Sequence, residues 1–268
     1  MYKAVFIDLD GTLLRADHSI SEATRNTIQN LIAKNILVVL VSARPYHGIT
    51  TISTWLGTGT LPIVSLNGAY IRLGDKVIFE SCLDLETVSE LHLQAKHYDT
   101  TLIYYTGLKW YAEKGNAATV KEQRITNVKV IVAPFESLMQ DWNINITGLN
   151  KIMAIGGEKV IAAQEAKLLS IFQERLNIYT SKPTYLEIMR KDASKSIAIK
   201  YLLDRFRISR EESLAIGDNF NDREMIIYAG TGVAMGNAPD AIKAVADHVT
   251  DSNQNDGVRK AIEKFIPL

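Results

Sequence analysis

The chain has 268 residues with 30 basic and 30 acidic side chains, so its formal net charge at neutral pH is zero. Hydrophobic residues make up 47% and charged residues 22%, as in ordinary globular proteins, and zero net charge gives no general electrostatic reason to bind nucleic acid or an anionic membrane. The single cysteine, Cys82, excludes an internal disulfide and a cysteine-based zinc site, and it favours a reducing compartment.

Neither a membrane span nor a leader is expected. No segment approaches the roughly 20 apolar residues that a membrane-spanning helix needs, and the strongest apolar run, Ile36–Val41, has the length of a strand. The chain reaches Asp8 after only four apolar residues, which is too few for a signal peptide. We therefore expect a cytoplasmic protein.

The first third of the chain alternates strand and helix patterns. Ser21 can cap a helix with apolar residues on one face, and Gly57 can end the next helix. This βαβαβ order predicts a doubly wound, Rossmann-like α/β domain. The predicted elements are a strand over Ala4–Ile7, the helix after Ser21, a strand over Ile36–Val41, a helix over Thr50–Leu56 and a strand over Pro62–Leu66.

The middle of the chain has a different order. Gly74-Asp75 predicts a hairpin between two short strands. From about Asp84 to Met189 strands and helices mix, with a long helix near Glu158–Leu176, which suits an antiparallel sheet with helices on one side. We expect this α+β layer to be a cap inserted into the α/β domain.

The last third resumes the strand–helix rhythm. A helix is predicted over about Ser194–Phe206, a strand over Ser213–Ile216, a helix near Asp222–Ala229, a strand over Gly232–Met235 and two final helices. Residues 1–83 and 190–268 are therefore predicted to form one core domain and residues 84–189 the inserted domain, with boundaries uncertain by several residues.

Two aspartates directly follow the first predicted strand, where ligands bind in open α/β sheets. Asp8 and Asp10 are one residue apart and precede Gly11, so a tight turn can aim both acids at one point. One could act as a nucleophile while the other handles a proton. The plainer interpretation is an acidic turn that closes a strand.

Two further segments offer groups that bind anions. Ser42 and Arg44 follow the second long strand, and Lys195 comes just before a helix, where a fixed ammonium can neutralise a phosphoryl group. Taken alone, each segment is better explained by a helix cap and by solvated basic residues.

The fourth segment, Gly217–Asp222, follows a predicted strand and concentrates oxygen ligands. Asp218 and Asp222, with Asn221 beside them, suit Mg²⁺. The alternative is a polar turn in which Asp222 favours a helix N-terminus. All four segments occur in the right order along one α/β chain. Coincidence therefore explains the whole set less well than it explains any single segment.

With these segments in place, the chain resembles a haloacid dehalogenase (HAD) superfamily phosphatase of the Cof type, subfamily IIB, along essentially its whole length. This branch carries an α/β cap (C2-type) inserted mid-chain. The matching segments are Asp8–Leu14, Ser42–Arg44, Ser65–Ala69, Leu186–Ile188 leading to Lys195, Gly217–Asp222 and Gly232–Ala238.

The resemblance implies a role for each matching residue. Asp8 would attack the phosphoryl group and form an aspartyl-phosphate, while Asp10 would protonate the leaving oxygen and later deprotonate the attacking water. Mg²⁺ would be bound by the Asp8 carboxylate, the Asp10 main-chain carbonyl and Asp218, with Asp222 orienting or assisting. The implied substrate-binding set is Ser42, Ala43, Arg44, Asn67, Gly68, Lys195 and Asn221.

Three positions depart from the family pattern and put local loop geometry in doubt. Ser42-Ala43 stands where Thr-Gly is usual, Ser196 follows Lys195 where Gly is usual, and Met189-Arg190 replaces a common Thr-Pro. The serine keeps the hydroxyl, and no charged group that the chemistry needs is lost.

The expected substrate is a small phosphorylated metabolite. Sugar phosphates, pyridoxal phosphate and flavin mononucleotide all fit the resemblance, and the sequence sets no oligomeric state. A phosphatase of the sucrose- or trehalose-phosphate kind, a phosphomutase and a non-catalytic phosphometabolite sensor remain as alternatives.

The inserted domain is expected to set specificity, through residues near Tyr104–Tyr111 and Thr180–Tyr185. The aromatic residues of the first of these stretches are better explained by packing. The five histidines are scattered, with no spacing that suggests a zinc site.

Overall fold

The computed structural model describes residues 1–126 and 128–267 and divides into two compact units. The first, here called the core unit, comprises Met1–Ala43, Ile49–Ile78 and Ser194–Leu268. The second, the inserted unit, comprises Arg44–Gly48 and Phe79–Ala193. The predicted domains, residues 1–83 with 190–268 and residues 84–189, stay a prediction. Residues 127 and 268, which they include, lie outside the described part of the chain.

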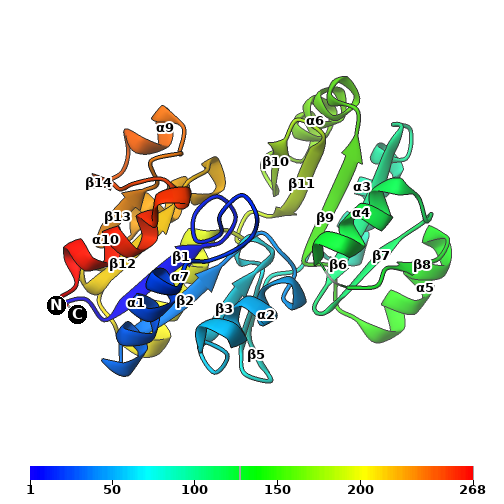
Figure 1. Cartoon of the computed structure of the whole chain (residues 1–268). Coiled ribbons are helices and arrows are strands. Elements are labelled where there is room, and N and C mark those ends of the chain that lie inside the picture. The colour runs from blue at the N-terminus through cyan, green and yellow to red at the C-terminus, as the bar shows by residue number, and fades with distance from the viewer. Residues whose placement is uncertain (127, 268) are drawn as a thin grey trace. The chain divides into compact units, whose positions relative to one another are not determined.

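An eight-stranded sheet organises the core unit, in the order β14-β13-β12-β1-β2-β3-β4-β5 (Figure 1). Strands β14 to β3 pair in parallel, and β4 runs antiparallel to β3. The strands are β1 (Ala4–Asp8), β2 (Leu37–Val41), β3 (Pro62–Ser65), β4 (Tyr70–Leu73), β5 (Lys76–Glu80), β12 (Ser213–Gly217), β13 (Thr231–Ala234) and β14 (His248–Val249).

Strands β1, β2 and β12 are buried at every residue. A parallel sheet covered on both faces requires such continuous apolar runs, because helices leave neither face to solvent. The register places Asp8 opposite Val41, and Ile7 opposite Ile216. The ends of these three neighbouring strands therefore lie at one edge of the sheet.

The described helices of the core unit are α1 (Glu22–Ala33), α2 (His47–Leu56), whose first two residues belong to the inserted unit, α7 (Lys195–Phe206), α8 (Arg223–Tyr228), α9 (Asp240–Lys243) and α10 (Gly257–Phe265). Ser21 caps α1 as predicted, because its Oγ accepts a hydrogen bond from the Thr24 amide at 3.1 Å. Helices α1 and α10 lie side by side (Figure 1), and α7 packs against α8. The strand order reverses at β1, so right-handed crossovers place helices on both faces, which confirms the doubly wound fold.

In its described residues, the inserted unit has a six-stranded sheet in the order β10-β11-β9-β6-β7-β8 and four helices. Neighbouring strands are antiparallel except β7 and β8, which are parallel. The strands are β6 (Thr100–Thr106), β7 (Lys109–Ala112), β8 (Ile131–Val132), β9 (Lys151–Gly156), β10 (Leu176–Lys182) and β11 (Tyr185–Arg190), and the helices are α3 (Leu85–Ala95), α4 (Ala117–Thr126), α5 (Phe135–Asn145) and α6 (Glu158–Phe172).

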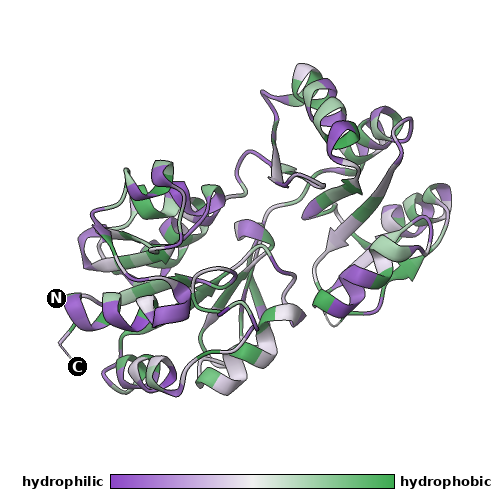
Figure 2. Ribbon diagram, turned by 45° about the horizontal axis from the view of Figure 1, so that its top comes forward, coloured by the Kyte–Doolittle hydropathy of each residue, from purple (hydrophilic) through white to green (hydrophobic). Residues whose placement is uncertain are grey.

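One hydrophobic cluster joins α3, α5 and α6 to one face of this sheet, with Tyr104 and Tyr111 against Trp142. Because side chains alternate along a strand, Tyr105 and Trp110 lie on the opposite face, where they stack with ring centroids 6.1 Å apart. All four aromatic side chains are buried, as their interpretation as packing residues predicts. Figure 2 shows hydrophobic residues concentrated along the strands.

The expectation that helices cover only one side of this sheet was wrong for α4. Tyr185 lies on the face opposite to the main cluster, since its neighbour Leu186 belongs to that cluster. The Tyr185 hydroxyl donates to Glu122 of α4 at 2.8 Å, so α4 packs on this second face.

The other deviations are local. The long helix ends at Phe172 rather than near Leu176, because Leu176 begins β10. A 3₁₀ turn over Phe220–Asp222 precedes α8, and the two-residue strand β14 was missed because it is too short to show a period. Among the described residues, no helix is long and apolar enough to cross a bilayer.

Candidate active site

Three strand ends bring polar side chains to one edge of the core sheet. Asp8 is the last residue of β1, Ser42 follows β2, and Asp218 follows β12. Strand β1 lies between β12 and β2, and all three run in parallel. This edge is the position at which open α/β sheets bind ligands, because the strand order reverses there.

Lys195 brings a buried ammonium to the same point. It is the first residue of α7, whose start Ser194 caps by accepting a hydrogen bond from the Ile197 amide at 3.3 Å. The Lys195 Nζ lies 2.5 Å from Asp8 Oδ1 and 2.5 Å from Asp222 Oδ1, and the residue is 1% exposed. Lys195, predicted from sequence to lie near the nucleophile, is therefore bonded to it.

Asp222 connects this lysine to the turn after β12. Its second oxygen, Oδ2, accepts hydrogen bonds from the main-chain amides of Asp218 at 2.9 Å and Asn219 at 3.0 Å. One carboxylate thus fixes both the ammonium of Lys195 and the backbone that carries Asp218. This arrangement suits the orienting role expected for Asp222.

The turn after β1 packs directly against Asp218. The Thr12 hydroxyl donates to Asp218 Oδ1 at 2.9 Å. Gly11 has a φ of +87°, and a Cβ at this position would lie 2.3 Å from Asp218 Oδ2. Only glycine allows this approach, which explains why the two acidic motifs require Gly11.

The carboxylates of Asp8, Asp218 and Asp222 form one cluster, with an oxygen of each within 4.8 Å of the others. Burial and the charge of Asp222 raise the pKa of Asp8 well above its ordinary range, although Lys195 opposes them. Burial and Asp222 likewise raise the pKa of Asp218 to about 6. Burial alone would lower the pKa of Lys195, but Asp222 and Asp8 outweigh it and raise the value.

This donor set fits a divalent cation. One ammonium faces three carboxylates, so the cluster carries excess negative charge, and carboxylate oxygens are the ligands that Mg²⁺ prefers. Of the predicted ligands, the structure brings Asp8 and Asp218 together. The Asp10 side chain is exposed, which agrees with a role expected through its main-chain carbonyl.

The predicted phosphate-binding residues Ser42, Asn67 and Asn221 are connected in the core unit. The Ser42 amide donates to the Val64 carbonyl at 2.9 Å, and the Asn67 amide donates to the Ser42 carbonyl at 3.0 Å. The Asn221 amide group donates to Asn67 Oδ1 at 3.1 Å.

The same turn also abuts the start of α7. A Cβ on Gly68, which has a φ of +97°, would lie 2.2 Å from the Ser194 carbonyl oxygen. Gly68 therefore lets the turn reach the residue that caps the helix of Lys195.

Ala43 and Arg44 fall on opposite sides of the unit boundary. Ala43 belongs to the core unit, whereas Arg44 belongs to the inserted unit, where its Nη1 donates to the Gly48 carbonyl at 3.4 Å. The geometry of the core unit therefore does not place Arg44 beside Asp8, and its substrate-binding role stays a prediction.

Sequence reasoning assigned no role to two residues that contact the cluster, Thr12 and Asn237. Thr12 donates to Asp218, as described above, and Asn237 Nδ2 lies 3.5 Å from Asp218 Oδ2. Thr12 and Asn237 both lie inside the matching segments, but the sequence of one segment does not show which residue of another segment it contacts. Their common partner, Asp218, is visible only in the structure.

The comparisons with known proteins agree with this geometry. The model of the haloacid dehalogenase-like hydrolases matches residues 5–262. The chain belongs to this family. A Haemophilus influenzae protein named "Putative phosphatase" is 35% identical over 100% of this chain and 99% of its own length.

Solved structures extend the likeness to the whole fold. A haloacid dehalogenase-like hydrolase from Bacteroides thetaiotaomicron has a TM-score of 0.88 and 31% identity over 99% of this chain and 100% of its own. A HAD subclass IIB sugar phosphatase has a TM-score of 0.85 and 26% identity over 98% of each chain. The Cof-type resemblance is confirmed, and the chain is a HAD-type phosphatase.

Proposed function

We propose that this HAD phosphatase hydrolyses phosphomonoesters of small metabolites, sugar phosphates among them, with Mg²⁺ and through an aspartyl-phosphate on Asp8. The observation that carries the proposal is the position of Asp8: a buried carboxylate at the edge of the sheet, bonded to Lys195 at 2.5 Å and close to Asp218. The likeness to a sugar phosphatase supports the substrate class.

In the first step, an oxygen of Asp8 attacks phosphorus and the bond from phosphorus to the leaving oxygen breaks. Both reactants are anionic, so their approach needs compensating positive charge. Lys195 provides one such charge at Asp8 Oδ1 and can hold the transferring phosphoryl oxygens. Asp222 keeps the ammonium in place by its own contact at 2.5 Å.

The carboxylates of Asp8 and Asp218, with the main-chain carbonyl of Asp10, would hold the Mg²⁺. When bound, this ion offsets the repulsion between carboxylate and phosphate and polarises the phosphoryl oxygens. The cluster holds three carboxylates around one ammonium, and burial together with the charge of Asp222 raises the pKa values of Asp8 and Asp218, which supports this assignment.

Asp10 would handle the protons. Its carboxyl group donates a proton to the leaving oxygen, and the resulting carboxylate then removes a proton from water. That water attacks phosphorus of the aspartyl-phosphate, which releases inorganic phosphate and regenerates the Asp8 carboxylate. The exposed position of Asp10, next to the buried nucleophile in the chain, suits a group that exchanges protons with solvent.

The side chains around the phosphoryl group would set its orientation. Main-chain hydrogen bonds fix the backbone at Ser42 and Asn67, and the Asn221 side chain donates to Asn67 Oδ1. The inserted unit would serve as the cap that contacts the leaving group and sets specificity, as its sequence position suggests.

The test is phosphate release from a panel of sugar phosphates and other phosphomonoesters, measured with Mg²⁺ and with a chelator. Wild-type release that the chelator stops, and that Asp8→Asn abolishes, supports the proposal. Asparagine is nearly isosteric with aspartate but lacks the charge for attack. Release by Asp8→Asn at the wild-type rate would exclude the covalent mechanism, and unchanged release with chelator would exclude the metal.

A further inference from the structure

Asn237 joins three segments of the core unit that are far apart in the chain. It lies in the loop between β13 and α9 and is exposed. Its Nδ2 donates to the Gly11 carbonyl at 2.8 Å and lies 3.5 Å from Asp218 Oδ2, and its Oδ1 accepts from the Asn253 amide at 3.0 Å. One side chain thus contacts the turn after β1, the turn after β12 and the loop before α10.

The loop that carries Asn237 is itself fixed to the sheet. The Met235 amide donates to the Gly217 carbonyl at 3.0 Å, and the Gly236 amide donates to the Asp251 carbonyl at 3.0 Å. The first of these bonds reaches the residue directly before Asp218. The backbone that carries Asn237 is therefore fixed beside the acidic cluster.

The contacts of Asn237 close a ring with the turn after β1. Asn237 holds the Gly11 carbonyl, the next residue is Thr12, and the Thr12 hydroxyl donates to Asp218 Oδ1 at 2.9 Å. Asn237 then approaches the other oxygen of the same carboxylate. Both oxygens of Asp218 thus face donors that belong to one hydrogen-bonded ring.

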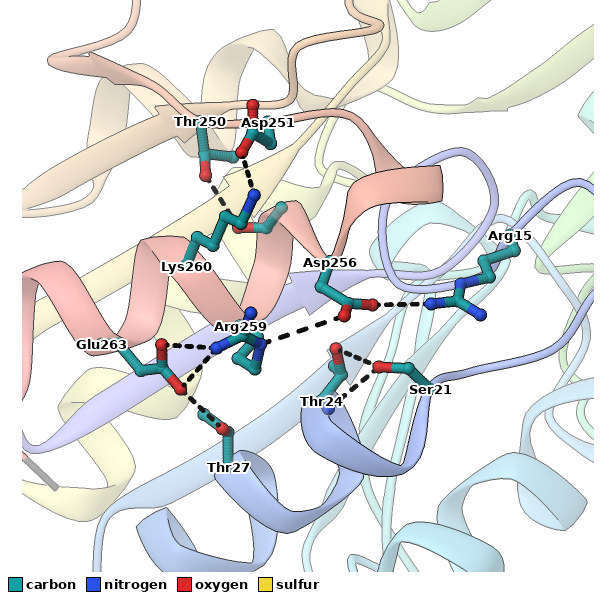
Figure 3. Close-up of polar contacts among 11 residues, drawn as sticks. Arg15, Ser21, Thr24, Thr27, Thr250, Asp251, Asp256, Arg259, Lys260 and Glu263 are labelled. Atoms are coloured by element: carbon teal, nitrogen blue, oxygen red, sulfur yellow. Dashed lines mark hydrogen bonds and ion pairs between the residues drawn. The ribbon is translucent and has the colours of Figure 1, made fainter.

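The same turn is held further along its length by the C-terminal part of the chain. Asn253 Nδ2 donates to the Leu14 carbonyl at 2.7 Å. Arg15 Nη2 donates to Asp256 Oδ1 at 2.9 Å, and Figure 3 shows this pair between the turn and α10. Asn237, Asn253 and Asp256 therefore attach the turn at Gly11, Leu14 and Arg15 in succession.

We propose that Asn237 is a positioning residue, which fixes the Asp218 carboxylate relative to the turn that carries Asp8 and Asp10. This inference rests on the proposed function, since the distance between these acids matters only if they bind one cation. Side chains that orient metal ligands in this way typically change metal affinity or activity by about 10- to 100-fold when they are removed.

An asparagine is suited to this task where an aspartate is not. The carboxamide supplies two N–H donors for Gly11 and Asp218 and one oxygen for the Asn253 amide. An aspartate of the same shape would keep the acceptor but lose both donors, and its charge would repel Asp218. Comparing Asn237→Ala with Asn237→Asp therefore distinguishes the effect of losing the N–H donors from the effect of losing side-chain volume.

The experiment measures two properties of the full-length protein and both variants. The first is Mg²⁺ binding to metal-free wild type and Asn237→Ala by calorimetry, which needs no turnover. The second is kcat and KM at saturating Mg²⁺ for wild type, Asn237→Ala and Asn237→Asp on the best substrate of the panel. Asn30→Ala, an exposed asparagine on α1, is the matched control.

We expect Asn237→Ala to bind Mg²⁺ about 10-fold or more weakly and to lose about 10- to 100-fold in kcat, with KM within about threefold. Asn237→Asp should also lose kcat, although it fills the same space, because it lacks both donors. Asn30→Ala should match wild type in every measurement.

Wild-type kcat in Asn237→Asp would overturn the inference, because it would show that only size matters at this position. Wild-type Mg²⁺ affinity and kcat in Asn237→Ala would overturn it as well. If Asn237→Ala does not fold, the aspartate variant still decides. A wild-type protein that binds Mg²⁺ but hydrolyses nothing would contradict the proposed function, while the Mg²⁺ measurement on Asn237→Ala would still test this residue.

Discussion

Each unit of the molecule buries a lysine against carboxylates, and the two arrangements differ in charge balance. In the inserted unit, Lys151 Nζ lies 3.3 Å from Glu187, whose carboxylate also accepts from the Tyr179 hydroxyl at 3.4 Å. In the core unit, Lys195 contacts two carboxylates at 2.5 Å, and a third, Asp218, lies in the same cluster.

The difference separates a stabilising pair from a site that attracts a cation. Lys151 is paired with one carboxylate, that of Glu187, and the ring of Tyr105, 5.0 Å from the Lys151 ammonium, adds a favourable contact. The single positive charge of Lys195 cannot neutralise the three carboxylates around it. Protonation of a carboxylate or a bound cation must neutralise the remaining negative charge. Buried charge indicates chemistry only where it is unbalanced.

The largest effect should follow from removing the cation of the unbalanced cluster. Lys195→Met should lower the rate of phosphate release at least about 100-fold, since the phosphoryl group loses its fixed positive charge. Phosphate release at saturating substrate checks this. Lys200→Met, an exposed lysine on the same helix, should release phosphate like wild type. A Lys195→Met rate within a few-fold of wild type would show that this ammonium is not part of the reaction.

The balanced pair should affect stability instead. Lys151→Met leaves Glu187 buried without its partner, which should lower the free energy of unfolding by about 3–5 kcal/mol. Denaturant unfolding followed by the fluorescence of Trp110 and Trp142, both in the inserted unit, measures this. The Mg²⁺ affinity of the folded variant should equal that of wild type. Weaker Mg²⁺ binding would contradict the distinction between the two lysines.

Asp218 should make the metal-free protein less stable as pH rises. Its pKa is raised from 3.8 to about 6, so the folded state binds the proton more tightly than the unfolded state does. The stability that this proton contributes is present below pH 3.8 and is lost as pH rises through about 6.

Asp218→Asn removes this loss, so at pH 7 the metal-free variant should be more stable than wild type by about 1 kcal/mol or more. Added Mg²⁺ should stabilise wild type but not the variant. Melting curves between pH 4 and pH 7, with and without Mg²⁺, test both statements. A variant less stable than wild type at pH 7 would mean that the ionised Asp218 carboxylate does not destabilise the metal-free protein.

The smallest effect is expected at the partly exposed pair of Arg15 and Asp256. Asp256→Asn should cost at most about 1 kcal/mol of stability, because solvent screens the pair. Asp240→Asn is the control and should change nothing measurable, because the Asp240 side chain is fully exposed and lies 3.9 Å from Lys243. A loss at Asp256 well above this range would mean that the ion pair controls the fold of the turn.

The sequence predicted the elements whose signal is local. The apolar strands before Asp8, Ser42 and Asp218 indicated the sheet, and the parallel order then placed these residues at one edge. Ser21 and Gly57 marked helix ends in the same local way. The two acidic motifs were identified because each follows a predicted strand and concentrates acidic side chains. Lys195 was identified only as a member of the whole set, since a solvated basic turn explains it better when it is taken alone.

What the sequence did not predict depends on contacts between distant segments. Thr12 and Asp218 are 206 positions apart, so no spacing could pair them. The contact that places α4 on the second face of its sheet joins Glu122 to Tyr185, 63 positions away, so the sequence did not indicate it. Asn237 had no assigned role because its partners Gly11 and Asn253 come from two other loops.

The most direct test of the central claim is to locate the phosphoryl group during turnover. A rapid acid quench of the wild-type protein with Mg²⁺ and its best substrate, followed by peptide mass spectrometry, reports where phosphate is bound covalently. The account predicts a phosphorylated peptide containing Asp8, absent from Asp8→Asn. Turnover with phosphate on another residue, or with Asp8→Asn labelled like wild type, would contradict it.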